Sequence, residues 1–343
     1  MIAPGKIYFI SEHSSQEFFH GGIGPADIEK ILLRNGAISI SFPYHFEFSP
    51  KAKMARMGYL VKMCLTISPG SVIVFQHPLY ARMHKLLLQM MRRRKSVKLV
   101  CLVADIDGIK DGNENFLKKE IHFLSAFKYF IVHNSKMYAW LQSFHPSAVC
   151  TLLQCFDFLT KPATHKRVLT NNIVFAGNLQ KSRFLELLHI WLQKHPTLHV
   201  NLYGPGITKD MLISKNVTFK GVHPPYVLPD FIEGSFGLIW DGNGIEKPSG
   251  SLGNYMQYIS HHKLSLYIVC NLPIIVHEDT GSAEFVKKFN IGFTVKSLFE
   301  IEDKINALSE TDYQSMVQNT YKLSIDITEG NGLQNALTAV LLK

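Results

Sequence analysis

The stretch that decides the fold is Asn172-Ile173-Val174-Phe175-Ala176-Gly177-Asn178-Leu179-Gln180-Lys181-Ser182-Arg183. A short apolar run ends at a glycine, and a helix-like segment follows. Such a strand–turn–helix unit builds parallel sheets covered by helices. Glycine permits a tight turn after the strand, and the first amides of the following helix attract an anion.

The same unit recurs along the chain, which predicts an α/β protein with two doubly wound, Rossmann-like domains that face each other across a cleft. In the first half we expect strands at Lys6–Ile10, Ala37–Phe42, Ser71–Phe75, Lys98–Ala104 and Tyr129–Val132. In the second half we expect strands at Asn172–Phe175, His199–Tyr203, Val217–Lys220, Phe236–Trp240, Pro273–Val276 and Gly292–Val295. Helices are expected at Pro25–Arg34, Asn115–Ala126, Ser182–Lys194, Val227–Glu233, Leu264–Cys270, Ser282–Lys288 and Ile301–Leu308.

A polar stretch without periodicity, Pro162–Thr170, is typical of a linker. It divides the chain into a first domain, residues 1–168, and a second domain, residues 169–331. The last helical segment, about residues 332–343, either stays with the second domain or packs back on the first. A length of 343 residues suits two domains.

Composition limits the class of protein. Hydrophobic residues make up 46% and charged residues 18%, which excludes a disordered or collagen-like chain. The five cysteines lack the short paired spacing of a disulfide framework or a structural zinc site. We find neither a run of about 18–20 apolar residues that would span a membrane nor a signal peptide. The sequence therefore predicts a cytoplasmic protein.

The net charge of +9 is unevenly distributed. Residues 1–168 hold 22 Lys and Arg against 11 Asp and Glu, whereas residues 169–343 hold 14 against 16. Two amphipathic helical patterns, over residues 51–63 and 80–95, carry much of the excess and interleave it with methionine and leucine. One interpretation is two core-packed helices with solvated basic faces. The other is a basic surface that rests on anionic lipid, peripheral at the inner face of the cell membrane. Nucleic-acid binding lacks a supporting motif.

Phosphate-binding features gather in the second half. Lys181 and Arg183 place positive charge where a diphosphate would lie, although Arg183 also fits a solvated helix face. Two further turns follow strands, Tyr203-Gly204-Pro205-Gly206 and the glycine-rich loop after Asp241. A polar loop then leads through Tyr255 to a basic helix start. The cluster at that start suits a nucleoside diphosphate and contains His262, Lys263 and Ser265.

Two features of the first half could meet an acceptor. The loop with Gly21, Gly22 and Gly24 imitates a dinucleotide fingerprint but lacks its last glycine, so we interpret it as a flexible acceptor loop. Asp105 and Asp107 directly follow an apolar strand. They could contact acceptor hydroxyls or act as a general base, cap a helix, or bind a divalent metal. The cations already available for a diphosphate make a metal unnecessary, and we expect none.

These residues resemble those of the GT-B glycosyltransferases, and more narrowly the group of the streptococcal adhesin glucosyltransferases and the bacterial β-1,6-galactofuranosyltransferases. The resemblance is carried by Ala104–Gly108, Ile131–Met137, Phe175–Phe184, His262–Tyr267 and Asn271–Val276. It implies that a UDP-sugar is surrounded by Asn178, Lys181, Tyr203, His262, Lys263 and Ser265. It also implies that Gly21–Gly24 and Asp105–Asp107 line the acceptor side.

The leading hypothesis is a hexosyltransferase that moves glucose, galactose or galactofuranose from a UDP-sugar to a hydroxyl of a bacterial surface glycan, without a cofactor. The glycan could be carried on a polyprenyl diphosphate or on a glycoprotein, and the enzyme could be a homo-oligomer. One alternative is a non-catalytic subunit that binds nucleotide-sugars. Another is a dinucleotide-dependent oxidoreductase or epimerase, which would need the intact glycine fingerprint.

Overall fold

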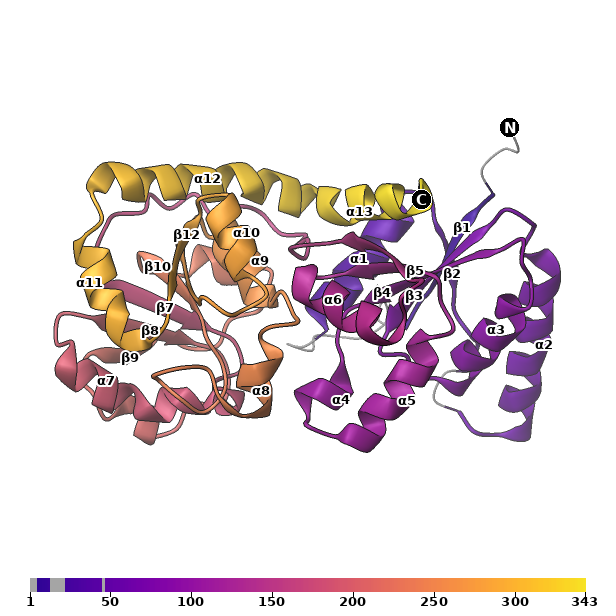
Figure 1. Cartoon of the computed structure of the whole chain (residues 1–343), viewed down its shortest axis with the longest axis horizontal. Helices are drawn as coiled ribbons and strands as arrows, with labels where there is room; N and C mark the ends of the chain where they lie inside the picture. The colour runs from indigo at the N-terminus through magenta and orange to yellow at the C-terminus, as the bar shows by residue number, and fades with distance from the viewer. Residues whose placement is uncertain (1–4, 13–21, 45–46) are drawn as a thin grey trace.

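The computed structural model describes residues 5–12, 22–44 and 47–343. Two lobes lie side by side (Figure 1), and each contains a six-stranded, fully parallel sheet. The first sheet has the strand order β2-β1-β3-β4-β5-β6. Its strands are β1 (Ile7–Ile10), β2 (Ile38–Ile40), β3 (Val72–His77), β4 (Lys98–Val103), β5 (Tyr129–Val132) and β6 (Val149–Leu152).

The second sheet has the order β12-β11-β10-β7-β8-β9. Its strands are β7 (Asn172–Ala176), β8 (His199–Tyr203), β9 (Val217–Phe219), β10 (Phe236–Ile239), β11 (Ile274–His277) and β12 (Gly292–Val295). The predicted pair of doubly wound sheets is thereby confirmed. In such sheets the chain order reverses at one position, and ligands bind outside the carboxyl ends of the strands there.

Helices cover both faces of the sheets. Those of the first lobe are α1 (Ile23–Arg34), α2 (Pro50–Thr66), α3 (Arg82–Arg92), α4 (Asp107–Lys110), α5 (Glu114–Leu124) and α6 (Ser135–Phe144). The later ones are α7 (Leu188–Lys194), α8 (Gly250–Tyr255), α9 (His262–Val269), α10 (Ala283–Lys288), α11 (Ile301–Asn306), α12 (Glu310–Glu329) and α13 (Asn331–Leu341). Short 3₁₀ turns are η1 (Leu179–Lys181), η2 (Arg183–Leu187), η3 (Asp210–Leu212), η4 (Leu228–Asp230) and η5 (Leu298–Glu300). None of the helices in these described ranges is long and apolar enough to cross a lipid bilayer.

Burial on both faces explains the apolar strand sequences. In β4 every residue from Leu99 to Val103 is buried, and alternate side chains enter two separate clusters. Cys101 and Val103 pack under α3 and α5, whereas Val100 and Leu102 pack under α1 and α13. Parallel strands covered on both faces are apolar throughout rather than alternating.

The chain ends on the first lobe. Helix α12 runs along the second lobe and stops at Gly330, which has φ +86°. Helix α13 continues across to the first lobe (Figure 1) and buries Leu333 and Val340 against the cluster around Phe9. The buried Asp157 carboxylate accepts hydrogen bonds from the first backbone amides of α13, at 3.0 Å from Gly332 N and 2.7 Å from Leu333 N.

Three local predictions need correction. The strand β6 was not expected, because its four residues are only half-buried at the sheet edge and form no apolar run. The helix expected at Ser182–Lys194 is divided into η2 and α7. The helix expected at Val227–Glu233 is only the 3₁₀ turn η4, in which Pro229 removes a backbone donor.

Candidate active site

Each sheet has one point where the strand order reverses. In the first sheet it lies between β1 and β3, and in the second between β7 and β10. The loops that leave β7 and β10 begin at Gly177 and Trp240, and the loop that leaves β1 begins at Ser11. Both reversal points are therefore candidate ligand sites.

Lys263 occupies the reversal point of the second sheet. It lies in the first turn of α9, and its Nζ is 3.5 Å from Asp241 Oδ2 and 4.1 Å from the centre of the Phe175 ring. Burial lowers the pKa of Lys263, and the nearby Asp241 partly offsets this effect. Asp241 is held independently, since its Oδ1 accepts hydrogen bonds from Ser182 Oγ at 3.1 Å and Gly242 N at 3.0 Å. The arrangement is a buried cation with a loosely placed counter-ion.

The backbone around this lysine leaves no room for side chains. Gly177 has φ +148°, and a Cβ there would lie 3.0 Å from Lys263 Cε. Gly204, at the end of β8, has φ +124°, and a Cβ there would lie 1.9 Å from Gly177 O. Because neither glycine has a side chain, the ends of β7 and β8 can lie in contact beside the Lys263 ammonium group. Glycine also lets the backbone approach a ligand closely.

Two histidines precede Lys263. Burial lowers the pKa of His261 and of His262 to about 4, so both are neutral at pH 7. The His262 ring packs against Phe158 with the ring centres 4.9 Å apart, and its Cδ2 faces Gly24 of α1. The buried Nε2 atom of His262 has no hydrogen-bond partner among the described residues. His262 therefore lies where the two lobes meet.

Other residues predicted to bind the donor differ in their exposure and in their hydrogen bonds. Lys181 and Arg183 are exposed, and the exposed Asn178 caps η1 by accepting a hydrogen bond from Lys181 N at 3.3 Å. The Tyr203 hydroxyl is bonded to the backbone of Phe231 and Glu233. The Ser265 hydroxyl donates to Phe156 O at 2.7 Å and ties α9 to the interdomain segment. Their donor contacts remain predictions.

A cavity of about 1180 Å³ lies at the reversal point of the first sheet. Gly22, Gly24 and Asp105 line it, and so does His262 from the second lobe. Three predicted acceptor residues and one predicted donor residue thus share one hollow. Gly21 lies outside the described residues.

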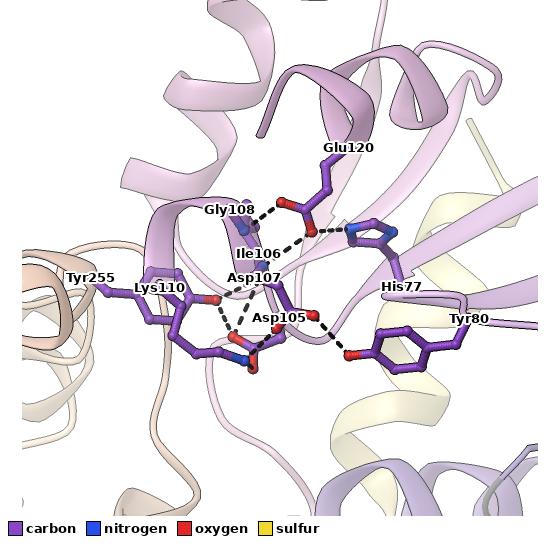
Figure 2. Close-up of polar contacts among 9 residues, drawn as sticks. All are labelled: His77, Tyr80, Asp105, Ile106, Asp107, Gly108, Lys110, Glu120 and Tyr255. Carbon is purple, nitrogen blue, oxygen red and sulfur yellow. Dashed lines mark hydrogen bonds and ion pairs between the residues drawn. The ribbon is translucent and has the colours of Figure 1, made fainter. Parts of the chain in front are cut away.

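Asp105 and Asp107 belong to a dense polar network (Figure 2). Lys110 forms ion pairs with both carboxylates and lies 2.6 Å from Asp105 Oδ2. Burial opposes the charge of Lys110, but the two carboxylates outweigh it and raise the pKa of this lysine. Tyr80 donates a hydrogen bond to Asp107 Oδ2 at 2.7 Å. Both carboxylates thus share one internal cation, which balances one of their two negative charges.

Tyr255 connects this network to the second lobe. It lies at the end of α8, and its hydroxyl donates to Asp105 Oδ1 and accepts from Ile106 N at 2.6 Å. Sequence analysis predicted that Tyr255 contacts the donor. In the structure its hydroxyl is hydrogen-bonded to the loop that carries Asp105 and Asp107. Burial and the Asp105 charge raise the pKa of Tyr255 well above its usual value, so the hydroxyl stays protonated.

Four polar residues that the sequence analysis did not identify support the same cavity wall, in two pairs. Glu120 of α5 accepts hydrogen bonds from the backbone amides of Asp107 and Gly108 and pairs with His77 Nε2 at 3.0 Å. Glu12 forms an ion pair with His84 of α3. Their sequence spacing carries no signal, because each pair joins elements that are far apart along the chain.

No group of three or more His, Cys, Asp or Glu side chains that could hold a metal ion occurs within residues 5–12, 22–44 and 47–343. Lys110 forms ion pairs with both Asp105 and Asp107, and the absence of a metal stays a prediction.

Comparison with known proteins identifies the family. Two models of the glucosyltransferase 3-like family match the chain, the N-terminal domain over residues 7–146 and the C-terminal domain over residues 173–340. The chain belongs to this family of glycosyltransferases. It is 25% identical over 274 residues to the β-1,6-galactofuranosyltransferase WbbI of Escherichia coli K12, covering 79% of each chain. It is 23% identical over 312 residues to glucosyltransferase 3 of Streptococcus gordonii, covering 90% of each.

Solved structures confirm the GT-B fold. Sucrose-phosphate synthase from Thermosynechococcus elongatus aligns with a TM-score of 0.65 at 13% identity, covering 98% of this chain and 99% of that one. The Anabaena protein HepE, solved with UDP and glucose, aligns with a TM-score of 0.61 at 12% identity over 98% and 99% of the two chains. The predicted class of enzyme, a hexosyltransferase with two Rossmann-like lobes, is thereby confirmed.

Proposed function

We propose that the enzyme transfers a hexose, namely glucose, galactose or galactofuranose, from a UDP-sugar to a hydroxyl of a bacterial surface glycan. The observation that carries the donor assignment is Lys263, a buried cation at the strand-order reversal point with only a loose counter-ion. A diphosphate supplies the negative charge that such a site lacks.

In the proposed reaction an acceptor oxygen bonds to the anomeric carbon, and the bond from that carbon to the β-phosphate oxygen breaks. UDP leaves with the bonding electrons, and the hydroxyl proton passes to a base. Lys263 and the first amides of α9 stabilise the charge that develops on UDP. Neutral His262 lines the cavity and can contact the sugar or the acceptor through its ring.

Asp105 is our candidate for the base, since it lines the cavity while Asp107 does not. Its ion pair with Lys110 holds it in place for acceptor hydroxyls. The same pair supports a reaction without a metal, because an internal ammonium group already occupies the position between the carboxylates.

A donor screen tests this function. The protein is incubated with UDP-glucose, UDP-galactose, UDP-galactofuranose or UDP-GlcNAc, and release of UDP is measured without and with glycan acceptors. We expect slow hydrolysis of one hexose donor and faster UDP release with an acceptor. Binding of UDP without transfer to any acceptor would favour the alternative of a non-catalytic subunit.

We also propose that the enzyme works in the cytoplasm and rests on the inner face of the cell membrane. Helices α2 and α3 pack against each other at one end of the molecule (Figure 1). Basic residues on their surface alternate with the exposed side chains of Met54, Val61 and Leu65. A surface that is both basic and apolar suits anionic lipid headgroups.

Vesicle co-sedimentation tests the membrane contact. Vesicles with anionic lipid should retain the protein at low salt and release it at high salt, because surface charges are screened. Equal binding to neutral and anionic vesicles would refute the proposal. Assembly into a homo-oligomer stays a prediction that light scattering can test.

A further inference from the structure

The cavity of the first lobe is larger than a single sugar needs. Its volume of about 1180 Å³ exceeds the roughly 300–1,000 Å³ that is usual for small-molecule sites. It extends from Asp105 and His262, where the reaction is proposed, to helices α2 and α3. The far end therefore has room for a part of the acceptor that lies away from the reacting hydroxyl.

That far end is positively charged. Lys53 and Arg56 of α2 and Arg82 of α3 all line the cavity. Within the described part of the chain, none of the three forms an ion pair with a carboxylate. Arg56 is bound only through Nη1 to Tyr44 O at 2.5 Å, which leaves its other donors for a ligand. The acidic lining residues are already engaged, Glu12 with His84 and Asp105 with Lys110.

The same end is also apolar. Phe42, Met57 and Met83 line the wall beside the three cations. Phe48 lies at the cavity with 79% of its surface exposed, although a large aromatic side chain normally avoids such exposure. An exposed aromatic side chain next to a cavity marks a contact for an apolar partner.

These apolar side chains continue onto the outer surface of α2. Met54 is 74% exposed and Leu65 is 80% exposed, and both belong to the helix that supplies Met57 to the cavity. An apolar chain whose head group lies at Lys53 and Arg56 could therefore leave the cavity along α2 toward the surface proposed to meet the membrane.

We infer that this cavity binds the diphosphate and the adjoining isoprenoid units of a lipid-linked acceptor. The inference rests on the proposed function and decides between the two acceptor carriers left open above. A diphosphate matches the three unpaired cations, and an isoprenoid chain matches the apolar wall. A glycopeptide carries neither group.

Binding of farnesyl diphosphate to the full chain, measured by calorimetry without membranes, tests the inference. Inorganic diphosphate and farnesol serve as comparison ligands, because each carries only half of the chemistry. The variant Lys53→Gln/Arg56→Gln removes two cavity cations. The matched control Lys51→Gln/Lys62→Gln removes two cations from the same helix that do not line the cavity.

We expect farnesyl diphosphate to bind at least tenfold more tightly than either comparison ligand. The cavity variant should weaken this binding at least tenfold, whereas the control variant should stay within about twofold. Equal affinity for inorganic diphosphate, or equal losses in both variants, would overturn the inference. UDP binding is measured in parallel: if UDP binds but farnesyl diphosphate does not, the inference fails while the donor assignment stands.

Discussion

Replacing Lys263 with methionine tests the donor site most directly. Methionine keeps most of the aliphatic length that packs between Gly177 and the Phe175 ring, and it removes only the ammonium group. Hydrogen bonds to charged groups contribute about 1.5–3 kcal/mol, so the dissociation constant for UDP should rise about 10- to 150-fold.

The same substitution should leave the fold intact. Burial penalises the charged form of Lys263, and Asp241 keeps its hydrogen bonds to Ser182 and Gly242 when the lysine is gone. Removing one partner of an ion pair leaves the other charge uncompensated, but the pair is long at 3.5 Å and Asp241 keeps two hydrogen-bond donors. We therefore expect at most a small fall in melting temperature together with markedly weaker UDP binding.

Calorimetric titration with UDP measures the effect, and Lys181→Met is the matched control. The sequence assigned both lysines to the diphosphate, but Lys181 is exposed and is expected to contribute less than a factor of about five at surface-pair energies. An unchanged UDP affinity in a folded Lys263→Met protein would refute the assignment of the donor site.

Three further outcomes are expected. Activity should persist in excess EDTA; complete loss that Mn²⁺ restores would mean that Asp105 and Asp107 bind a metal. Gly204→Ala should destabilise the protein by at least about 2 kcal/mol in urea unfolding, because the new Cβ would collide with Gly177 O; an unchanged midpoint would contradict this geometry. The melting temperature should fall between pH 7 and pH 5, and a rise would contradict the buried-histidine argument. Burial lowers the folded-state pKa of His133, His261 and His262 to about 4, so in this window the unfolded chain gains protons at these residues and the folded chain does not. Asp157 has the opposite effect, because burial raises its pKa to about 6, but this one group offsets only part of the lost stability.

Much of the fold could be predicted because parallel strands buried on both faces are apolar runs of a characteristic length. Strand β8 at His199–Tyr203 and strand β12 at Gly292–Val295 were predicted with their observed limits. The edge strand β6 was not predicted because its side chains are half-buried and include both polar and apolar types. Helix α12 was not predicted either, since its buried residues include Thr320 and Ser324 and weaken the apolar pattern.

The site could be predicted only in part, for a geometric reason. Sequence order shows which connections leave the carboxyl ends of strands. The connection after β4 carries Asp105, and the connection after β10 carries Lys263 in helix α9. Sequence order does not show side-chain direction. The 3₁₀ turn η1 leaves Lys181 exposed, and α8 directs Tyr255 to the opposite lobe. Lys110 was not identified as a site residue, because its ion pairs with Asp105 and Asp107 depend on the short helix α4 that carries it.

The return of α13 to the first lobe affects how the protein can be dissected. A fragment of residues 1–168 would lack the helix that covers one face of its own sheet. Strands β5 and β6, with Ile131 among their buried residues, would then lose the cover that α13 provides. A separately expressed first lobe should be poorly soluble, whereas supplying a peptide with the sequence of α13 should restore it. The chain also crosses between lobes twice, at the segment before β7 and at Gly330, so opening of the cleft must bend both crossings together.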